Sequence, residues 1–74
     1  PDDIPEYSLE NEDLIVNVIF NAGLLQSKGE ARRMIKQGAV KLDGESVSDI
    51  QAKISPKEHQ ILKVGKRRFL KVIE

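Results

Sequence analysis

The residues with the clearest chemical potential in this chain are basic, and four of them lie within one short segment. Lys28, Arg32 and Lys36 recur every four residues, and Arg33 lies beside them. On a helix this spacing gathers the cations on one side. Like charges held this close repel one another, and a polyanion such as a nucleic acid backbone would relieve the repulsion. For this segment alone, an ordinary solvated helix face is an equal alternative.

A second basic cluster lies near the end of the chain. Its members, which fall within nine positions, are Lys63, Lys66, Arg67, Arg68 and Lys71. Charges on the edge of a sheet can simply discourage aggregation between strands. That role explains one or two lysines better than three consecutive basic residues. The two clusters together therefore favour binding of RNA or DNA.

Other kinds of chemistry find little support in the sequence. The single histidine, His59, has no partner at ligand spacing, so we predict neither a metal site nor a catalytic role for it. The chain has no cysteine, which excludes disulfides and thiolate metal sites. It also contains no nucleophile elbow and no phosphate-binding glycine loop. We therefore predict a chain that is not itself an enzyme and needs no cofactor.

Length and charge distribution also favour a binding module. Seventy-four residues suffice for one small domain and are too few for a nucleotide-binding fold or a large cleft. The formal net charge is zero, but the six charges before Ser27 are all acidic. The rest of the chain holds twelve basic and six acidic residues and so carries about +6. One electropositive surface is therefore expected.

The start of the chain suggests a piece of a longer protein. Residues 1–6 are acidic and contain two prolines, as linkers often do. We expect residues 1–10 to be a linker or disordered extension and residues 11–74 to form the domain. Alternatively, Tyr7 and Leu9 dock onto the domain as a short anchor. No apolar run is long enough to cross a bilayer and no targeting segment is evident, so we predict a cytoplasmic domain without membrane contact.

Two helices are predicted, and the basic segment is the second of them. Ser27 and Glu30 have the spacing of a capping box, and Gly38 supplies the end of this helix. Its apolar stripe consists of Ala31, Met34 and Ile35. The first helix is predicted over residues 12–22, with Asn11 as its N-cap and acidic residues in its first turn. Its core-facing residues are Leu14, Ile15, Val18 and Ile19, while Asn17 and Asn21 are expected on the solvated side.

Strands are predicted after the second helix. Val40 and Leu42 alternate with polar residues before the tight-turn pair Asp43-Gly44, which indicates a hairpin. Residues 48–60 read as an irregular connection with a turn at Ser55-Pro56. A second hairpin follows over residues 61–73, and its turn is at Gly65-Lys66. We expect Phe20 and Phe69 to serve the core. Together these elements predict an α+β fold with two packed helices against a small, mainly antiparallel twisted sheet.

One continuous run carries a family resemblance. Residues 25–45, LQSKGEARRMIKQGAVKLDGE, resemble the alpha-L RNA-binding module first known from the fourth protein of the small ribosomal subunit. Within that superfamily the chain is most similar to the version at the carboxyl end of bacterial tyrosyl-tRNA synthetases, for which residues 63–69, KVGKRRF, are also typical. The similarity covers about residues 11–74. Asparagine commonly precedes the turn glycine in this family, whereas Asp43 here brings a negative charge beside the basic surface.

The resemblance implies the alpha-L RNA-binding fold and a tRNA-binding appendage of an aminoacyl-tRNA synthetase. The ATP-dependent catalytic domain of such a ligase would lie upstream in the parent chain. The partner would be tyrosine tRNA, held at its long variable arm and anticodon stem by phosphate contacts that position it. The isolated domain is expected to be monomeric. The RNA-binding residues that the resemblance implies are Lys28, Arg32, Arg33, Lys36, Lys63, Lys66, Arg67 and Arg68.

Two alternatives stay open at the level of the sequence. The same module occurs in pseudouridine synthases and ribosome-associated proteins, which differ in the domains attached to it. A different class of function would be a protein-interaction domain in which the acidic first part pairs with the basic part of another copy. Such pairing predicts dimers at low salt, whereas RNA binding predicts a monomer.

Overall fold

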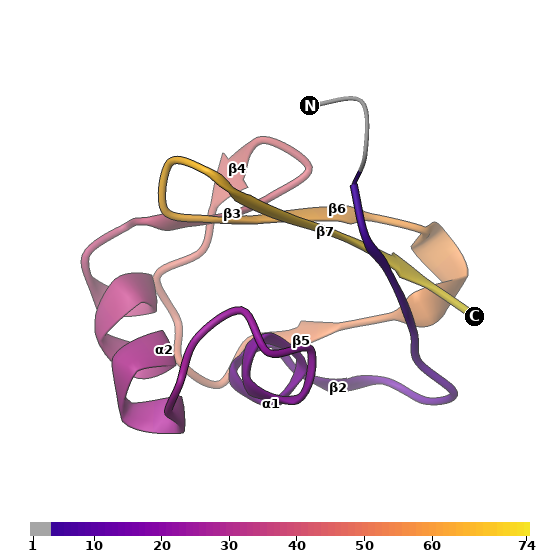
Figure 1. Ribbon diagram of the computed structural model, residues 1–74, viewed down its shortest axis with the longest axis horizontal. Helices are drawn as coiled ribbons and strands as arrows, with labels where there is room; N and C mark the ends of the chain where they lie inside the picture. Colours follow the sequence, from indigo (N-terminus) through magenta and orange to yellow (C-terminus); the bar gives the residue numbers. More distant parts are fainter. Residues whose placement is uncertain (1–3) are drawn as a thin grey trace.

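A hairpin of β6 (Ile61–Val64) and β7 (Arg68–Ile73) lies at the centre of the main sheet in the computed structural model, which describes residues 4–74 (Figure 1). Around it the described chain forms a five-stranded sheet with the order β1-β7-β6-β3-β4. The pairs are antiparallel except for β1 and β7, which run parallel. The predicted class, an α+β fold with a mainly antiparallel sheet, is therefore confirmed.

The helices form a second layer on one face of this sheet (Figure 1). They are α1 (Ile15–Asn21) and α2 (Lys28–Lys36), which pack against each other. A two-stranded ribbon of β2 (Asp13–Leu14) and β5 (Lys53–Ile54) lies beside α1 in the same layer. Neither helix of the described chain is long and apolar enough to cross a membrane.

The core fills the space between the two layers. Its fully buried side chains include Ile15, Val18 and Ile19 from α1, Ile35 from α2, and Val40, Leu62, Val64 and Val72 from the sheet. Successive strand residues point to opposite faces, so only every second residue of each strand reaches this core. The other residues of β3, β6 and β7 lie on the face of the sheet that the helices do not cover.

The second helix is built as its sequence predicts. The Ser27 hydroxyl accepts a hydrogen bond from the Glu30 amide at 3.1 Å, which is one half of the predicted capping box. At the other end Gly38 has φ +75°, and the amides of Gly38 and Ala39 donate to Ile35 and Met34. These two hydrogen bonds form a Schellman motif. The motif favours glycine at position 38, because the backbone is left-handed at that residue.

The predicted start of α1 is wrong by three residues. The helix begins at Ile15 rather than Glu12, because Asp13 and Leu14 pair with β5 instead. The Ile15 amide also donates to the Ala52 carbonyl at 2.9 Å. Asn11 is therefore not the N-cap, and the first turn of α1 contains no acidic residue.

Asp13 organises this junction through its side chain. Its Oδ1 accepts from the Leu14 amide at 2.7 Å and from the Asn17 side-chain amide at 2.9 Å. Asn17 is consequently half-buried and bonded rather than freely solvated, while Asn21 is exposed as expected. The Asp13 carboxylate thus stabilises the junction at which strand β2 ends and helix α1 begins.

The connections contain more regular structure than the sequence suggests. The hairpin of β3 (Val40–Leu42) and β4 (Glu45–Ser46) is confirmed. Residues 48–60, predicted as irregular, include β5 and a 3₁₀ helix, η1 (Pro56–Glu58), which begins at the predicted Ser55-Pro56 turn with Ser55 as its N-cap. A strand of two residues carries no periodicity, and its partner β2 lies far away in sequence, so local patterns do not reveal it.

The N-terminal segment is part of the fold from Pro5 onward, since the Pro5 carbonyl accepts from the Lys71 amide at 2.9 Å. Strand β1 (Glu6–Ser8) runs parallel to β7, and the Leu9 amide donates to the Ile73 carbonyl at 2.8 Å. Leu9 is only 8% exposed, and Tyr7 packs against the core. Residues 6–9 therefore dock through these two side chains rather than forming a free linker. Residues 1–3 of the expected linker lie outside the described residues.

The burial of α2 makes a stability prediction. Ile35 is 0% exposed, so Ile35→Ala leaves a cavity in the core and should cost about 2–5 kcal/mol of unfolding free energy. That loss is a large part of what a small domain has available. Lys36→Ala, the next residue on the exposed side, should change stability by less than about 0.5 kcal/mol. Thermal melts of both variants test this, and equal melting temperatures would show that the helix phase is wrong.

Candidate nucleic-acid interface

The four basic residues of α2 all lie at the surface. Lys28, Arg32, Arg33 and Lys36 are exposed, whereas Ala31 and Ile35 of the same helix are completely buried. The predicted division of the helix into a structural and a basic side therefore matches the burial. The ammonium of Lys28 lies 5.6 Å from the ring centre of Phe20 on α1.

The turn of the last hairpin packs against the carboxyl end of α2. The Gly65 amide donates to the Ala39 carbonyl at 2.8 Å. Gly65 has φ +69°, and a Cβ at this position would lie 3.3 Å from the Met34 Cε. The left-handed backbone thus favours glycine, and a Cβ would also crowd the tip of the Met34 side chain. This contact brings Lys66 and Arg67, both exposed, next to the end of the basic helix.

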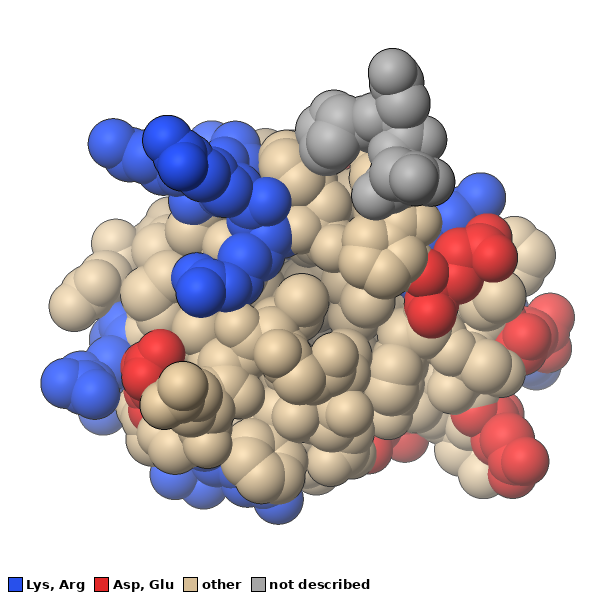
Figure 2. Space-filling view, viewed as in Figure 1, with Lys and Arg blue, Asp and Glu red and all other residues tan. Residues whose placement is uncertain are grey.

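The turn residues of the second cluster, Lys66 and Arg67, consequently share one end of the molecule with the basic helix. Figure 1 shows the β6–β7 turn directly above α2 at the left of the view. In Figure 2 most of the blue surface lies at this end, with some red beside it, while the opposite end is largely red. On the face seen in Figure 2, the charge separation along the sequence is therefore largely also a separation in space.

Helix geometry shows how the cations of α2 relate to the turn. At about 100° per residue, Met34 and Glu30 lie on the side of α2 that meets the turn. Arg32 and Lys36 lie on the other side of the buried stripe, and Arg33 lies between the two sides on the outer surface. A ligand that touches both clusters would therefore cross the outer surface of α2 at Arg33.

The remaining predicted residues occupy two other positions. Arg68 starts β7 and lines a polar pocket of about 420 Å³ together with Glu30 and the loop between the helices. Lys63 lies in the middle of β6 on the uncovered face of the sheet, away from α2. The structure thus brings Lys66 and Arg67 to the end of α2 and leaves Lys63 on a separate surface.

Both phenylalanines differ from their expected place in the core. Phe20 is 40% exposed because it follows the buried stripe of α1 by one residue, which rotates its side chain out of the core. Phe69 is half-buried on the uncovered face of the sheet, because its neighbour Leu70 points inward. The ammonium of Lys63 lies 5.5 Å from the centre of the Phe69 ring.

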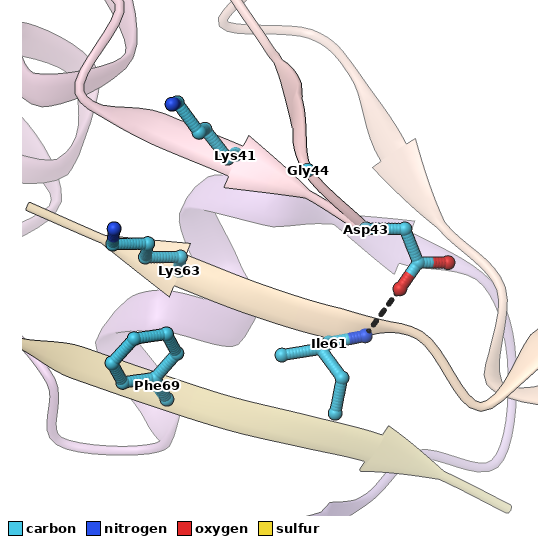
Figure 3. Close-up of a pocket in the computed structure, with 6 residues that line it drawn as sticks. All are labelled: Lys41, Asp43, Gly44, Ile61, Lys63 and Phe69. Carbon is cyan, nitrogen blue, oxygen red and sulfur yellow. Dashed lines mark hydrogen bonds between the residues drawn. The ribbon is translucent and has the colours of Figure 1, made fainter. Parts of the chain in front are cut away.

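The sequence did not indicate Lys41 as a residue of a possible site, and it did not reveal the structural role of Asp43. Lys41 alternates with two inward residues, so its outward position was visible in the pattern, but its neighbours across the sheet were not. Asp43 has φ +50°, and its amide donates to the Ile61 carbonyl of β6 at 2.9 Å. Its Oδ1 also accepts from the Ile61 amide at 2.8 Å (Figure 3). The carboxylate beside the basic surface therefore has a structural role.

His59 and the described acidic residues form no evident metal site. His59 is exposed at the end of η1, where its φ is +48°. Within residues 4–74 no group of three or more histidine, aspartate or glutamate side chains is arranged to hold a metal ion.

Comparison with known proteins settles the family. The model of the family described as "Tyrosine--tRNA ligase SYY-like C-terminal domain" matches residues 1–72. This chain belongs to that family. The resemblance drawn from residues 25–45 and 63–69 is thereby confirmed. Since the match begins at the first residue, the family also includes the segment that carries β1.

Relatives in this tyrosine–tRNA ligase family are similar over nearly the whole chain. The tyrosine–tRNA ligase of Desulfotalea psychrophila is 49% identical over 99% of this chain and 18% of its own length. That of Francisella tularensis is 47% identical over 99% of this chain and 18% of its own length, and that of Thermotoga maritima is 38% identical over 97% and 18%. The chain thus spans about 18% of the length of these relatives.

A solved structure supports the fold. The 30S ribosomal protein S4e from Thermoplasma acidophilum matches with a TM-score of 0.61 over 76% of this chain and 29% of its own. The sequences are 19% identical, so this similarity concerns the fold alone. It agrees with the alpha-L RNA-binding fold that the resemblance implied.

The hydrogen bond between Asp43 and β6 allows a prediction for position 43, where asparagine is common in the family. Asp43→Asn should change the unfolding free energy by less than about 0.5 kcal/mol, because an amide oxygen also accepts from Ile61 and asparagine tolerates a left-handed backbone. Asp43→Ala loses that bond and strains the turn, so it should cost about 1–2 kcal/mol. Urea denaturation measures both values.

Glu45→Ala is the matched control, since it removes a nearby exposed carboxylate from the same hairpin. It should leave stability nearly unchanged. If Asp43→Asn costs as much as Asp43→Ala, the negative charge rather than the hydrogen bond stabilises the turn.

Proposed function

We propose that this chain is the tRNA-binding domain appended to a tyrosine–tRNA ligase. The family assignment and relatives of this name support the parent enzyme, and the chain's share of about 18% of their length leaves room for a separate catalytic part. The observation that supports RNA binding is the packing of the β6–β7 turn on α2, since it places Lys66 and Arg67 beside the basic helix at one end of the molecule.

The mechanism is positioning rather than chemistry. Exposed arginine and lysine side chains bind phosphate oxygens, and contacts of this kind fix the orientation of an RNA without reading its bases. Arginine suits the task because its planar fork can hold two oxygens of one phosphate. The ligand is tyrosine tRNA, gripped at its long variable arm and anticodon stem. The catalytic part of the ligase then receives the tRNA in a fixed orientation.

The proposed contacts near α2 consist of one central residue and two flanking groups. Arg33 lies on the outer surface of α2 between its two sides, with Arg32 and Lys36 on one side and Lys66 and Arg67 on the other. An RNA backbone that crosses α2 at Arg33 therefore reaches both clusters. The full proposed set is Lys28, Arg32, Arg33, Lys36, Lys63, Lys66, Arg67 and Arg68.

Binding through these residues should depend strongly on salt. Each phosphate neutralised by the protein releases counterions, which adds roughly 0.7 to 0.9 to the slope of log affinity against log salt. Arg32→Ala and Arg67→Ala should each weaken tRNA binding, reduce the slope by about one contact, and leave the melting temperature unchanged. Titration of a tyrosine tRNA transcript with a long variable arm at several salt concentrations measures the slope for the parent chain and for each of the two variants.

Lys57→Ala provides the control, because it removes an exposed charge from η1 at the other end of the molecule (Figure 1). Its affinity and salt slope should equal those of the parent chain. A flat salt response, or normal affinity in the Arg32→Ala, Arg67→Ala double variant, would contradict the proposal. A salt-sensitive dimer of the chain without RNA would favour the charge-paired alternative.

A further inference from the structure

Three side chains form a row across the uncovered face of the sheet. Lys41 of β3 lies directly opposite Lys63 of β6, and Lys63 lies directly opposite Phe69 of β7. Residues paired in this way have neighbouring side chains on the same face. The inward neighbours of this row, among them Val40 and Leu62, belong to the core. The row therefore combines two cations and an aromatic ring on the side away from the helices.

This row lines a shallow pocket with two chemically different ends. The pocket has a volume of about 470 Å³ and is lined by Lys41, Asp43, Gly44, Ile61, Lys63 and Phe69. Figure 3 shows the two ammonium groups toward one end and the Asp43 carboxylate at the other. Ile61 and Phe69, both half-buried, supply apolar side chains to the lining, with Phe69 next to Lys63 and Ile61 next to Asp43.

The ends of the pocket limit what can occupy it. Two ammonium groups on neighbouring strands favour an anion, and the half-buried ring favours a flat apolar surface beside that anion. The carboxylate disfavours a second anion at its end, and one of its oxygens is already bonded to the Ile61 amide. A nucleotide has this composition, since its phosphate is anionic and its base is flat.

We propose that this pocket binds one unpaired nucleotide of a single-stranded RNA segment. The base stacks on the Phe69 ring, and the adjoining phosphate binds Lys41 and Lys63. The base takes the place of the Lys63 ammonium above the ring, because stacking of a base on an aromatic side chain is stronger than an exposed cation–π contact. Lys63 then turns to the phosphate.

The position of the pocket connects it to the proposed tRNA-binding end. Strand β6 leads from Lys63 into the turn that carries Lys66 and Arg67, so one RNA chain can follow the hairpin from the turn to the pocket. This inference rests on the proposed function, since it takes RNA as the partner. It differs in the ligand: paired bases in a duplex are inaccessible to stacking, whereas a loop or a free end supplies an unpaired base.

The test uses two RNA probes and a ring-removing variant. The first probe is a single-stranded RNA tetramer that contains the fluorescent base 2-aminopurine, and the second is a blunt RNA duplex. The parent chain should quench the fluorescence of the tetramer as the base stacks. Phe69→Leu keeps an apolar side chain but loses the ring, so it should abolish the quenching and weaken tetramer binding by roughly tenfold. Duplex binding should stay unchanged.

Two further variants keep the result independent of folding defects. Lys41→Ala changes an exposed side chain, and it should weaken tetramer binding several-fold without changing the duplex affinity. Phe20→Leu is the matched control, because Phe20 also has a lysine ammonium at a similar distance from its ring but lies outside the pocket. It should leave both the quenching and the affinity for the tetramer unchanged.

Several outcomes would overturn the inference. Normal quenching with Phe69→Leu, or an equal loss with Phe20→Leu, would show that the pocket holds no base. Equal competition by a tetraglutamate peptide would show that the site binds acidic chains in general. The proposed function is tested separately, since Arg32→Ala and Arg67→Ala should weaken duplex binding whatever Phe69→Leu does to the tetramer.

Discussion

The helices cover only one face of the five-stranded sheet, and this constraint shapes the rest of the molecule. Side chains along a strand alternate between the faces, so each strand divides its residues between a dry core and an open surface. Leu62, Val64, Leu70 and Val72 fill the core from the central hairpin. Lys63 and Phe69 alternate with them and remain accessible. The same geometry that builds the core thus also presents a second surface.

The contact between the β6–β7 turn and α2 brings the basic side chains of the turn next to those of the helix. Without it, the helix cations and the hairpin cations would be two unrelated groups of surface charges. Gly65 allows the turn to approach Met34, and the Gly65–Ala39 hydrogen bond fixes the register of this approach. No described acidic side chain forms an ion pair with either cluster, so the positive charges are not neutralised at close range. A polyanion is attracted by the field of these charges before any specific contact forms.

The acidic part of the chain has a different structural position. Glu12 forms an ion pair with Lys53 at 3.8 Å, but both side chains are more than half exposed, so the pair contributes little to stability. Asp13 instead acts through hydrogen bonds at the start of α1. Keeping these carboxylates at the end of the molecule away from α2 leaves the basic end free of their repulsion for phosphate. The formal net charge of zero therefore does not show that acidic and basic side chains gather at different ends of the molecule.

Features with local causes could be predicted from the sequence. The limits of α2 follow from Ser27 and Gly38, and the β3–β4 hairpin follows from Asp43-Gly44, because each depends on backbone bonds between residues close in the chain. The family could be recognised for the same reason, since its most specific residues lie in one run. The basic character of both clusters was also apparent, whereas their contact with RNA is a proposal.

Features that depend on distant partners were decided only by the tertiary structure. The start of α1 is set by the pairing of Asp13 with Ile54, and β1 is held by β7 from the other end of the chain. The register that places Phe69 opposite Lys63, and Lys63 opposite Lys41, likewise joins separate strands. A sequence pattern shows that a residue faces outward, but the residues that meet it there are set by strand pairing and packing.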